Sequence, residues 1–210
     1  MTPEMTVNTQ SSICIRGSEA VIRFDPFRIA GEPHDADIIF ITHDHYDHFS
    51  PDDIRKVSKP DTMLAAPESM KGALAKHGFT GALLLKPGET VSVRQIPVET
   101  VPSYNVLKPF HPKSAGNLGY VITVDGLRIY AAGDTDAVKE IKAVRCDIAF
   151  VPIGGIYTMN AKEAAALVNA IRPEIAVPIH YGSIVGKKSD GEVFRSLVDS
   201  SIETRLLLNG

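Results

Sequence analysis

Residues 42–48, with the sequence THDHYDH, concentrate groups that bind metal ions in one short stretch. The stretch follows the apolar run 36–42, whose β-branched and aromatic residues are typical of a strand buried on both faces. A turn from this strand into a helix that begins at Pro51 would gather the donor side chains around one point. These donors are His43, His45, Asp47 and His48. Imidazole and carboxylate groups together suit Zn²⁺, Mn²⁺ or iron, so the stretch predicts a site for one or two such ions.

Two further polar residues stand at the ends of predicted strands. Asp134 closes the run RIYAAGD, and His180 closes the run EIAVPIH. Proteins that combine strands and helices in this way place their functional sites at strand ends. Asp25 also follows an early strand and could line the pocket, but the pair Asp25-Pro26 is foremost a turn signal.

The stretch THDHYDH resembles the HxHxDH signature of the metallo-β-lactamase-fold hydrolases. Gly133-Asp134-Thr135 resembles the loop whose aspartate bridges two metal ions in that superfamily, and residues 178–182 resemble its last histidine-bearing strand end. The motifs occur in the family's order, and the resemblance covers roughly residues 11–209. The chain is also similar to a compact subgroup of Zn-dependent hydrolases near the ascorbate-6-phosphate lactonase and N-acylethanolamine-phospholipid phospholipase D branches. Glu99–Lys113, residues 154–159 and residues 180–183 carry that second likeness.

The resemblance implies a role for each ligand in a two-metal site. His43 and His45 would bind metal 1, and Asp134 would bridge the two metals. The ligands of metal 2 would be Asp47, His48 and His180. Asp47 and Asp134 are the candidate catalytic carboxylates.

Metal 1 is where the sequence departs from the family pattern. Its third ligand is usually a histidine, but Asn105 stands in the segment where that histidine is expected. Either Asn105 supplies a weaker oxygen ligand, or His111 takes the position, or metal 1 binds loosely. We rank a loose or altered metal 1 slightly ahead of His111 as the ligand.

These residues predict a metal-dependent hydrolase that acts on a small molecule. A water held between two cations ionises near neutral pH, so a metal-bound hydroxide would cleave an ester, a lactone or a phosphodiester. The expected cofactor is zinc, one or two ions per chain, with Mn²⁺ or iron as alternatives. Lys113, Tyr157 and Tyr181 are candidate contacts to an anionic substrate or to its transition state.

Two other functions use the same residues. The chain could be a non-catalytic binding or regulatory module that keeps its metal for structure, which only Asn105 favours. It could also be a mononuclear iron dioxygenase of the same fold that uses His43, His45 and Asp134. The second alternative ranks last because it leaves Asp47, His48 and His180 without a role.

The elements around the motifs predict an α/β protein with mixed sheets. Residues 118–134 form the clearest hairpin, with Asp125-Gly126 at its turn. Another pair of strands follows Gly88, separated near Pro97. Hairpins predominate in the first half of the chain and strand–helix–strand units in the second.

Helices are expected after Ser50, within residues 67–78 and within residues 161–173, where Asn160 and Glu163 form a variant of the capping box. Two β-rich halves that each end in helices are compatible with a pseudo-duplicated sandwich. The resemblance implies the same architecture: a four-layer αββα sandwich of two mixed β-sheets flanked by helices, in a single domain spanning residues 1–210.

The composition describes an ordinary globular chain. It has 210 residues, of which 44% are hydrophobic, and a net charge of −3, which argues against disorder and against a basic nucleic-acid surface. No apolar run approaches the ~20 residues that a membrane span needs, and the N-terminus shows no export signal. With only two cysteines, Cys14 and Cys146, the expected setting is the cytoplasm. A small molecule is the expected partner, and a homo-oligomer is plausible.

Overall fold

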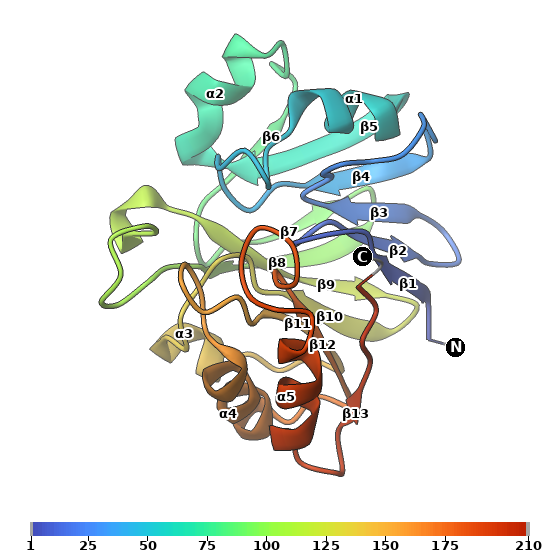
Figure 1. Ribbon diagram of the computed structural model, residues 1–210. Helices are drawn as coiled ribbons and strands as arrows, with labels where there is room; N and C mark the ends of the chain where they lie inside the picture. The colour runs from blue at the N-terminus through green and yellow to red at the C-terminus, as the bar shows by residue number, and fades with distance from the viewer. Residues whose placement is uncertain (1, 209–210) are drawn as a thin grey trace.

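The first half of the chain forms a six-stranded sheet in the computed structural model, which describes residues 2–208 (Figure 1). Its spatial order is β1-β2-β3-β4-β5-β6. The pairs β1–β2 and β2–β3 are antiparallel, and the pairs from β3 to β6 are parallel. The strands are β1 (Glu4–Val7), β2 (Ile13–Arg16), β3 (Val21–Phe24), β4 (Ala36–Phe40), β5 (Ser58–Pro67) and β6 (Leu83–Leu85).

The second half forms a seven-stranded sheet in the order β13-β12-β11-β10-β9-β8-β7. Strands β7 to β10 are an antiparallel meander, and the pairs from β10 to β13 are parallel. The strands are β7 (Thr90–Val93), β8 (Ile96–Pro102), β9 (Leu118–Val124), β10 (Leu127–Ala131), β11 (Ile148–Pro152), β12 (Ile175–Ile179) and β13 (Glu203–Thr204). Both sheets therefore begin antiparallel and end parallel.

Helices cover the outer face of each sheet (Figure 1). The first sheet carries α1 (Pro51–Val57) and α2 (Lys71–Lys76), which follows the 3₁₀ turn η1 (Glu68–Met70). The second sheet carries α3 (Lys139–Lys142), α4 (Ala161–Ile171) and α5 (Asp190–Leu197), and a second 3₁₀ turn, η2 (Lys113–Ala115), precedes β9. The Phe24 and Phe40 rings stack on each other in the first sheet, and both pack at tilted angles against the Tyr120 ring of the second sheet. The predicted fold class, two mixed β-sheets flanked by helices, is confirmed.

Local sequence signals account for several elements. Asn160 accepts hydrogen bonds from the backbone of Lys162 and Glu163, and Glu163 returns one, so the predicted capping box begins α4. Asp125 and Gly126 both have positive φ, of 50° and 80°, as the tight turn between β9 and β10 requires.

Other elements differ from the prediction. Strands β1, β5 and β6 were not expected. Strand β6 has only three residues, and β5 contains Lys, Pro and Asp with no clean alternation. The prediction that hairpins predominate in the first half of the chain is wrong, because the strand pairs from β3 to β6 are parallel. The turn between β7 and β8 lies at Arg94 and Gln95, both of positive φ, and Pro97 is within β8.

The parallel strands bring the predicted site residues to one edge of the sandwich. In the first sheet, Asp25 follows β3 and residues 42–48 follow β4 closely; in the second, Asp134 follows β10 and His180 follows β12. The backbone N–H of Leu118, at the start of β9, donates to the carbonyl of Thr42 (3.0 Å) and joins the two sheets there. Because parallel strands end at the same edge, segments far apart in the sequence meet at one place.

Candidate metal centre

The loop after β4 turns back on itself and points its histidines inward. The backbone N–H groups of His48 and Phe49 both donate to the carbonyl of His45 (2.9 and 2.7 Å), which closes the turn before α1. His43 and His48 are fully buried, and their ring centroids are 4.0 Å apart. The sequence motif thus becomes a compact cluster, as its spacing predicted.

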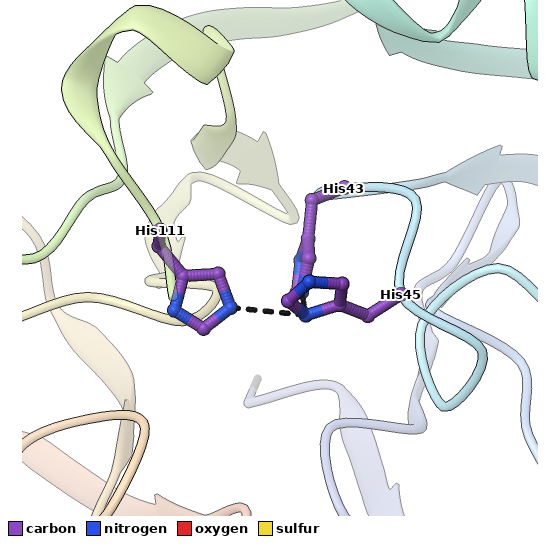
Figure 2. A group of neighbouring side chains, drawn as sticks. All are labelled: His43, His45 and His111. Atoms are coloured by element: carbon purple, nitrogen blue, oxygen red, sulfur yellow. Dashed lines mark hydrogen bonds between the residues drawn. The ribbon is translucent and has the colours of Figure 1, made fainter. Parts of the chain in front are cut away.

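Three imidazoles converge at one side of the cluster, a group that we call site 1: His43, His45 and His111. Nε2 of His43 and Nε2 of His111 each lie 3.1 Å from Nδ1 of His45 (Figure 2). Ligand atoms placed tetrahedrally at zinc–nitrogen bond lengths are about 3.3 Å apart. Since one hydrogen on His45 cannot satisfy both neighbours, the three nitrogens fit a shared cation better than they fit one another.

The geometry of site 1 bears on the third ligand of metal 1, for which Asn105, His111 and loose binding were the alternatives. It brings His111 to His43 and His45, whereas Asn105 lies behind His111 and away from the convergence point. The amide nitrogen of Asn105 donates to the carbonyl of Tyr157 (3.0 Å), so Oδ1 of Asn105 faces Nδ1 of His111 (2.9 Å). Asn105 therefore fixes the proton of His111 on Nδ1 and leaves Nε2 free to bind a metal ion.

We expect Asn105→Ala to weaken zinc binding at site 1 by about 10–100-fold, because His111 loses the acceptor that holds its tautomer and orientation. Zinc titration against a chromophoric chelator measures this affinity. Asn105→Asp keeps an acceptor for Nδ1 and should restore most of the binding. Unchanged zinc affinity in Asn105→Ala would show that His111 needs no such support.

A second group, which we call site 2, contains Asp47, His48 and His180. Oδ2 of Asp47 lies 3.4 Å from Nε2 of His180 and 3.7 Å from Nε2 of His48. His180 has a φ of 56°, a conformation that a non-glycine residue rarely adopts, and its backbone N–H donates to the carbonyl of Gln10 (2.9 Å). The backbone after β12 is therefore held in the shape that turns His180 toward the cluster.

Asp134 lies between the two sites. Its carboxylate is within 3.4 Å of Nε2 of His48, 3.2 Å of Nε2 of His180 and 3.6 Å of Nε2 of His111. It thus lies near one histidine of site 1 and two of site 2, and the bridging role that the resemblance implies stays a prediction.

The charges of the cluster are unevenly distributed. Burial lowers the pKa of His43 well below its usual range and also lowers the pKa of His111, so both imidazoles are neutral. Burial opposes the charged form of His180 too, but the Asp134 carboxylate outweighs it and raises the pKa of His180 to about 9. Asp134 itself is fully buried, yet His180 and His48 hold its pKa well below the ordinary value.

Several buried polar atoms of the cluster have no hydrogen-bond partner, which is costly in a protein interior. They include Nε2 of His48, Nε2 of His180 and Oδ1 of Asp134. All three face the space between the sites. A cation bound there would satisfy them together, so the residues present fit the metal that the fold implies.

Asp25, expected from the sequence only as a turn residue that could line the pocket, is not among the pocket-lining residues and instead supports the histidines. Its buried carboxylate accepts from Nδ1–H of His48 (2.7 Å), and from the backbone N–H and the hydroxyl of Thr42 (2.8 and 2.7 Å). The Thr42 hydroxyl in turn lies 3.0 Å from Nδ1 of His43. Asp25 therefore orients one histidine directly and another through Thr42. Its position at the end of β3, a strand end like those of the other site residues, was the available signal.

A pocket of about 350 Å³ is lined in part by residues of this His/Asp cluster. Its lining residues are His45, Tyr46, Asp47, Phe110, Asp134, Tyr157, His180 and Ile184. Of the three candidate substrate contacts, only Tyr157 is among them. Tyr181 is buried against Gly191 of α5, and Lys113 donates to Glu140 (2.6 Å) with its ammonium 4.9 Å from the centre of the Tyr104 ring. The structure brings neither Lys113 nor Tyr181 to the pocket.

We expect Lys113→Ala to change kcat/KM less than about twofold, because surface ion pairs contribute little and this one lies outside the pocket. The substitution should act on Glu140 instead. The Lys113 ammonium lowers the pKa of Glu140 to about 2, so its loss should raise that pKa toward the ordinary value. Carboxyl NMR titration measures the shift. A large fall in kcat/KM would instead place Lys113 on the substrate.

Fold and site together define a metallo-β-lactamase-fold protein, and residues 4–180 match the family model described as the beta-lactamase superfamily domain. Within that superfamily, the chain belongs to the UPF0173 metal-dependent hydrolase family. It is 34% identical to the member from Thermoplasma acidophilum over 186 residues, which cover 82% of this chain and 81% of the relative. It is 31% identical to the member from Thermococcus onnurineus over 211 residues, covering 93% and 92%.

A solved structure supports the same assignment. The crystal structure of a Parabacteroides distasonis protein, described as a metal-dependent hydrolase, is similar to this chain with a TM-score of 0.81 and 35% sequence identity. The match covers 96% of this chain and 90% of that protein. The resemblance inferred from THDHYDH is confirmed, and the protein is a member of a metal-dependent hydrolase family.

Proposed function

We propose that this protein uses zinc to hydrolyse an ester, lactone or phosphodiester bond of a small molecule. The observation that carries the proposal is the position of the cluster on the floor of an open pocket, where four metal-binding residues face the space that a substrate would fill. These residues are His45, Asp47, Asp134 and His180.

The open pocket distinguishes this proposal from a structural metal site. Structural zinc sites are closed by four protein ligands, whereas catalytic sites leave a position for water or substrate. A divalent ion held by the residues of sites 1 and 2 would supply Lewis-acid chemistry, lowering the pKa of water toward 7 and polarising the bond to be broken. The Asp134 carboxylate, which lies between the two sites, would accept a hydrogen bond from the attacking water and orient it toward the pocket.

The donor set favours zinc. Sites 1 and 2 offer five imidazoles and one carboxylate, with a second carboxylate from Asp134 between them and no cysteine. Imidazole suits zinc, copper, iron and nickel, and carboxylates widen the choice to manganese, so Mn²⁺ and iron are the competing metals. A mononuclear iron dioxygenase is disfavoured because three ligands would leave the remaining histidines without a role.

Metal analysis paired with an activity screen tests the proposal. Protein purified without chelator or added metal should contain one or two zinc ions per chain by elemental analysis. It should hydrolyse at least one of three probes: bis(p-nitrophenyl) phosphate, a lactone or a carboxylic ester. A chelator should abolish turnover, and added zinc should restore it. Zinc-loaded protein that leaves all three classes intact would contradict the proposal, and oxygen consumption by an iron-loaded form would favour the dioxygenase.

We further propose a cytoplasmic setting. Cys14 and Cys146 are both free thiols, as is usual in a reducing compartment. In the part of the chain that the structure describes, every helix is too short or too polar to cross a bilayer.

A further inference from the structure

We infer that the substrate is an uncharged carboxylic ester or lactone with a short apolar group, which the walls of the metal pocket hold. This inference rests on the proposed hydrolase function and narrows its substrate class. The floor of the pocket consists of metal-binding residues, and its walls are apolar or aromatic. The wall residues are Tyr46, Phe110, Tyr157 and Ile184.

On the side of site 1, the pocket wall is formed by the residue next to His111 in the sequence. Phe110 directly precedes His111, and its ring meets the Tyr157 ring edge-to-face with centroids 4.6 Å apart. Lys108 donates to the carbonyl of Thr158 (2.7 Å), which ties the loop of Phe110 to the loop of Tyr157. A substrate group in contact with Phe110 would therefore lie next to site 1.

The exposure of this wall indicates a binding surface. Phe110 is 42% exposed and Tyr46 is 64% exposed, so both present large aromatic surfaces to the solvent around the pocket. Exposed apolar surface beside a concave site is typical of ligand-binding grooves. A pocket of about 350 Å³ is at the small end of ligand sites and suits a short acyl or aryl group.

The charges around the pocket argue against a phosphate ester. No Lys or Arg is among the described residues that line it, whereas phosphate sites normally supply such cations. Lys108 is held by Asp136 (2.5 Å), and Arg28 donates to Ser183 (3.2 Å) while lying over the Phe27 ring. The carboxylates of Asp47 and Asp134 also offset part of any metal charge at the floor.

The reaction on such a substrate is a simple hydrolysis. Water oxygen forms a bond to the acyl carbon, and the bond from that carbon to the alkoxy oxygen breaks. The alkoxy oxygen leaves with a proton from the water, which gives a carboxylic acid and an alcohol, or one hydroxy acid from a lactone. Neither oxidant nor reductant takes part.

A chain-length series tests the apolar wall. We expect kcat/KM of the zinc-loaded protein to rise from p-nitrophenyl acetate through butyrate to hexanoate, by up to about fourfold for each methylene that becomes buried. Each of these esters should be cleaved faster than bis(p-nitrophenyl) phosphate. A flat series, or a phosphodiester cleaved faster than every ester, would overturn the inference while leaving the hydrolase function intact.

Variants identify the wall residues. Phe110→Ala and Ile184→Ala should each reduce the advantage of hexanoate over acetate by about tenfold, since each removes most of the apolar surface against which one part of the acyl chain would be buried. Leu107→Ala is the matched control, because Leu107 is 94% exposed in the same loop and lies outside the pocket lining. Arg28→Ala should leave the series unchanged. A loss of activity confined to anionic substrates in Arg28→Ala would show that the substrate is charged.

Binding separates this inference from the hydrolase proposal. Calorimetry should show that the zinc-loaded protein binds hexanohydroxamate more tightly than acetohydroxamate, and that Phe110→Ala narrows the difference. If every ester, lactone and phosphodiester resists hydrolysis, the proposed function fails, yet this comparison still decides the nature of the pocket. Equal affinities for the two hydroxamates would overturn the apolar subsite.

Discussion

Asp134→Asn is expected to lower kcat/KM by about 10²–10³-fold or more, because it removes the carboxylate that lies between both metal sites. In the native protein that carboxylate is within 3.6 Å of Nε2 of His111, His48 and His180. Asparagine has nearly the same shape but carries no charge, so the loss reports on the charge and not on packing. Turnover assays and elemental analysis of bound zinc together measure the effect.

The same substitution should abolish stabilisation by metal. A ligand at a hundred times its Kd stabilises a folded protein by about 2.7 kcal/mol, which raises Tm by roughly 5–10 °C for a chain of this size. Wild-type protein should show this rise when zinc is added and lose it with chelator, and Asp134→Asn should show little of it. Asp44→Asn is the control, since Asp44 is exposed in the same loop as His43 and His45. An Asp134→Asn protein that keeps its zinc and its turnover would refute the bridging role.

Asp25→Asn should weaken zinc binding at site 2 by about 10–100-fold, although Asp25 is not among the described residues that line the pocket at the cluster. The Asp25 carboxylate accepts the Nδ1–H of His48 and so leaves Nε2 of His48 free for a metal. An asparagine amide that donates to Nδ1 would move the proton to Nε2 and block it. Asn also tolerates the positive φ of this position, 43°, so the backbone should stay in place.

Stability and metal affinity together test the role of Asp25. Asp25→Ala should lower the free energy of unfolding of the metal-free protein by about 3–5 kcal/mol, because it leaves the buried His48 without its partner. Asp25→Asn should lower it less. Asp52→Asn is a matched control on the nearby α1, where Asp52 is 91% exposed. Chemical denaturation and zinc titration of the three variants provide the measurements. If Asp25→Asn bound zinc as the wild type does, Asp25 would have a purely structural role.

Local sequence was enough to predict much of the site. His43, His45, Asp47 and His48 lie within six positions, so one turn of the chain brings them together whatever the distant segments do. Asp134 and His180 were added through the family resemblance of their motifs, and each also stands at the end of an apolar strand. The hairpin turn at Asp125-Gly126 and the capping box of α4 were equally local, and both were predicted.

Long-range contacts were beyond the reach of the same reasoning. His111 and His45 are separated by 66 positions, and their meeting depends on how the loop after β8 lies across the end of the other sheet. Asp25 and His48 are joined by the pairing of β3 with β4, which the Asp-Pro pair does not reveal. Lys113 and Tyr181 were candidate substrate contacts by residue type, but their neighbours Glu140 and Gly191 direct them elsewhere.

The sequence by itself thus predicted the fold class, a metal-dependent hydrolase and the candidate ligands that local spacing and the family motifs supply. Only the tertiary structure placed His111 beside His43 and His45, revealed the hydrogen bonds that join Asn105 and Asp25 to the histidines, and gave the pocket its apolar walls. The physical reason is that residue type and periodicity act over a few positions, whereas a histidine's tautomer and a pocket's lining depend on groups that the packed sheets bring together from distant parts of the chain.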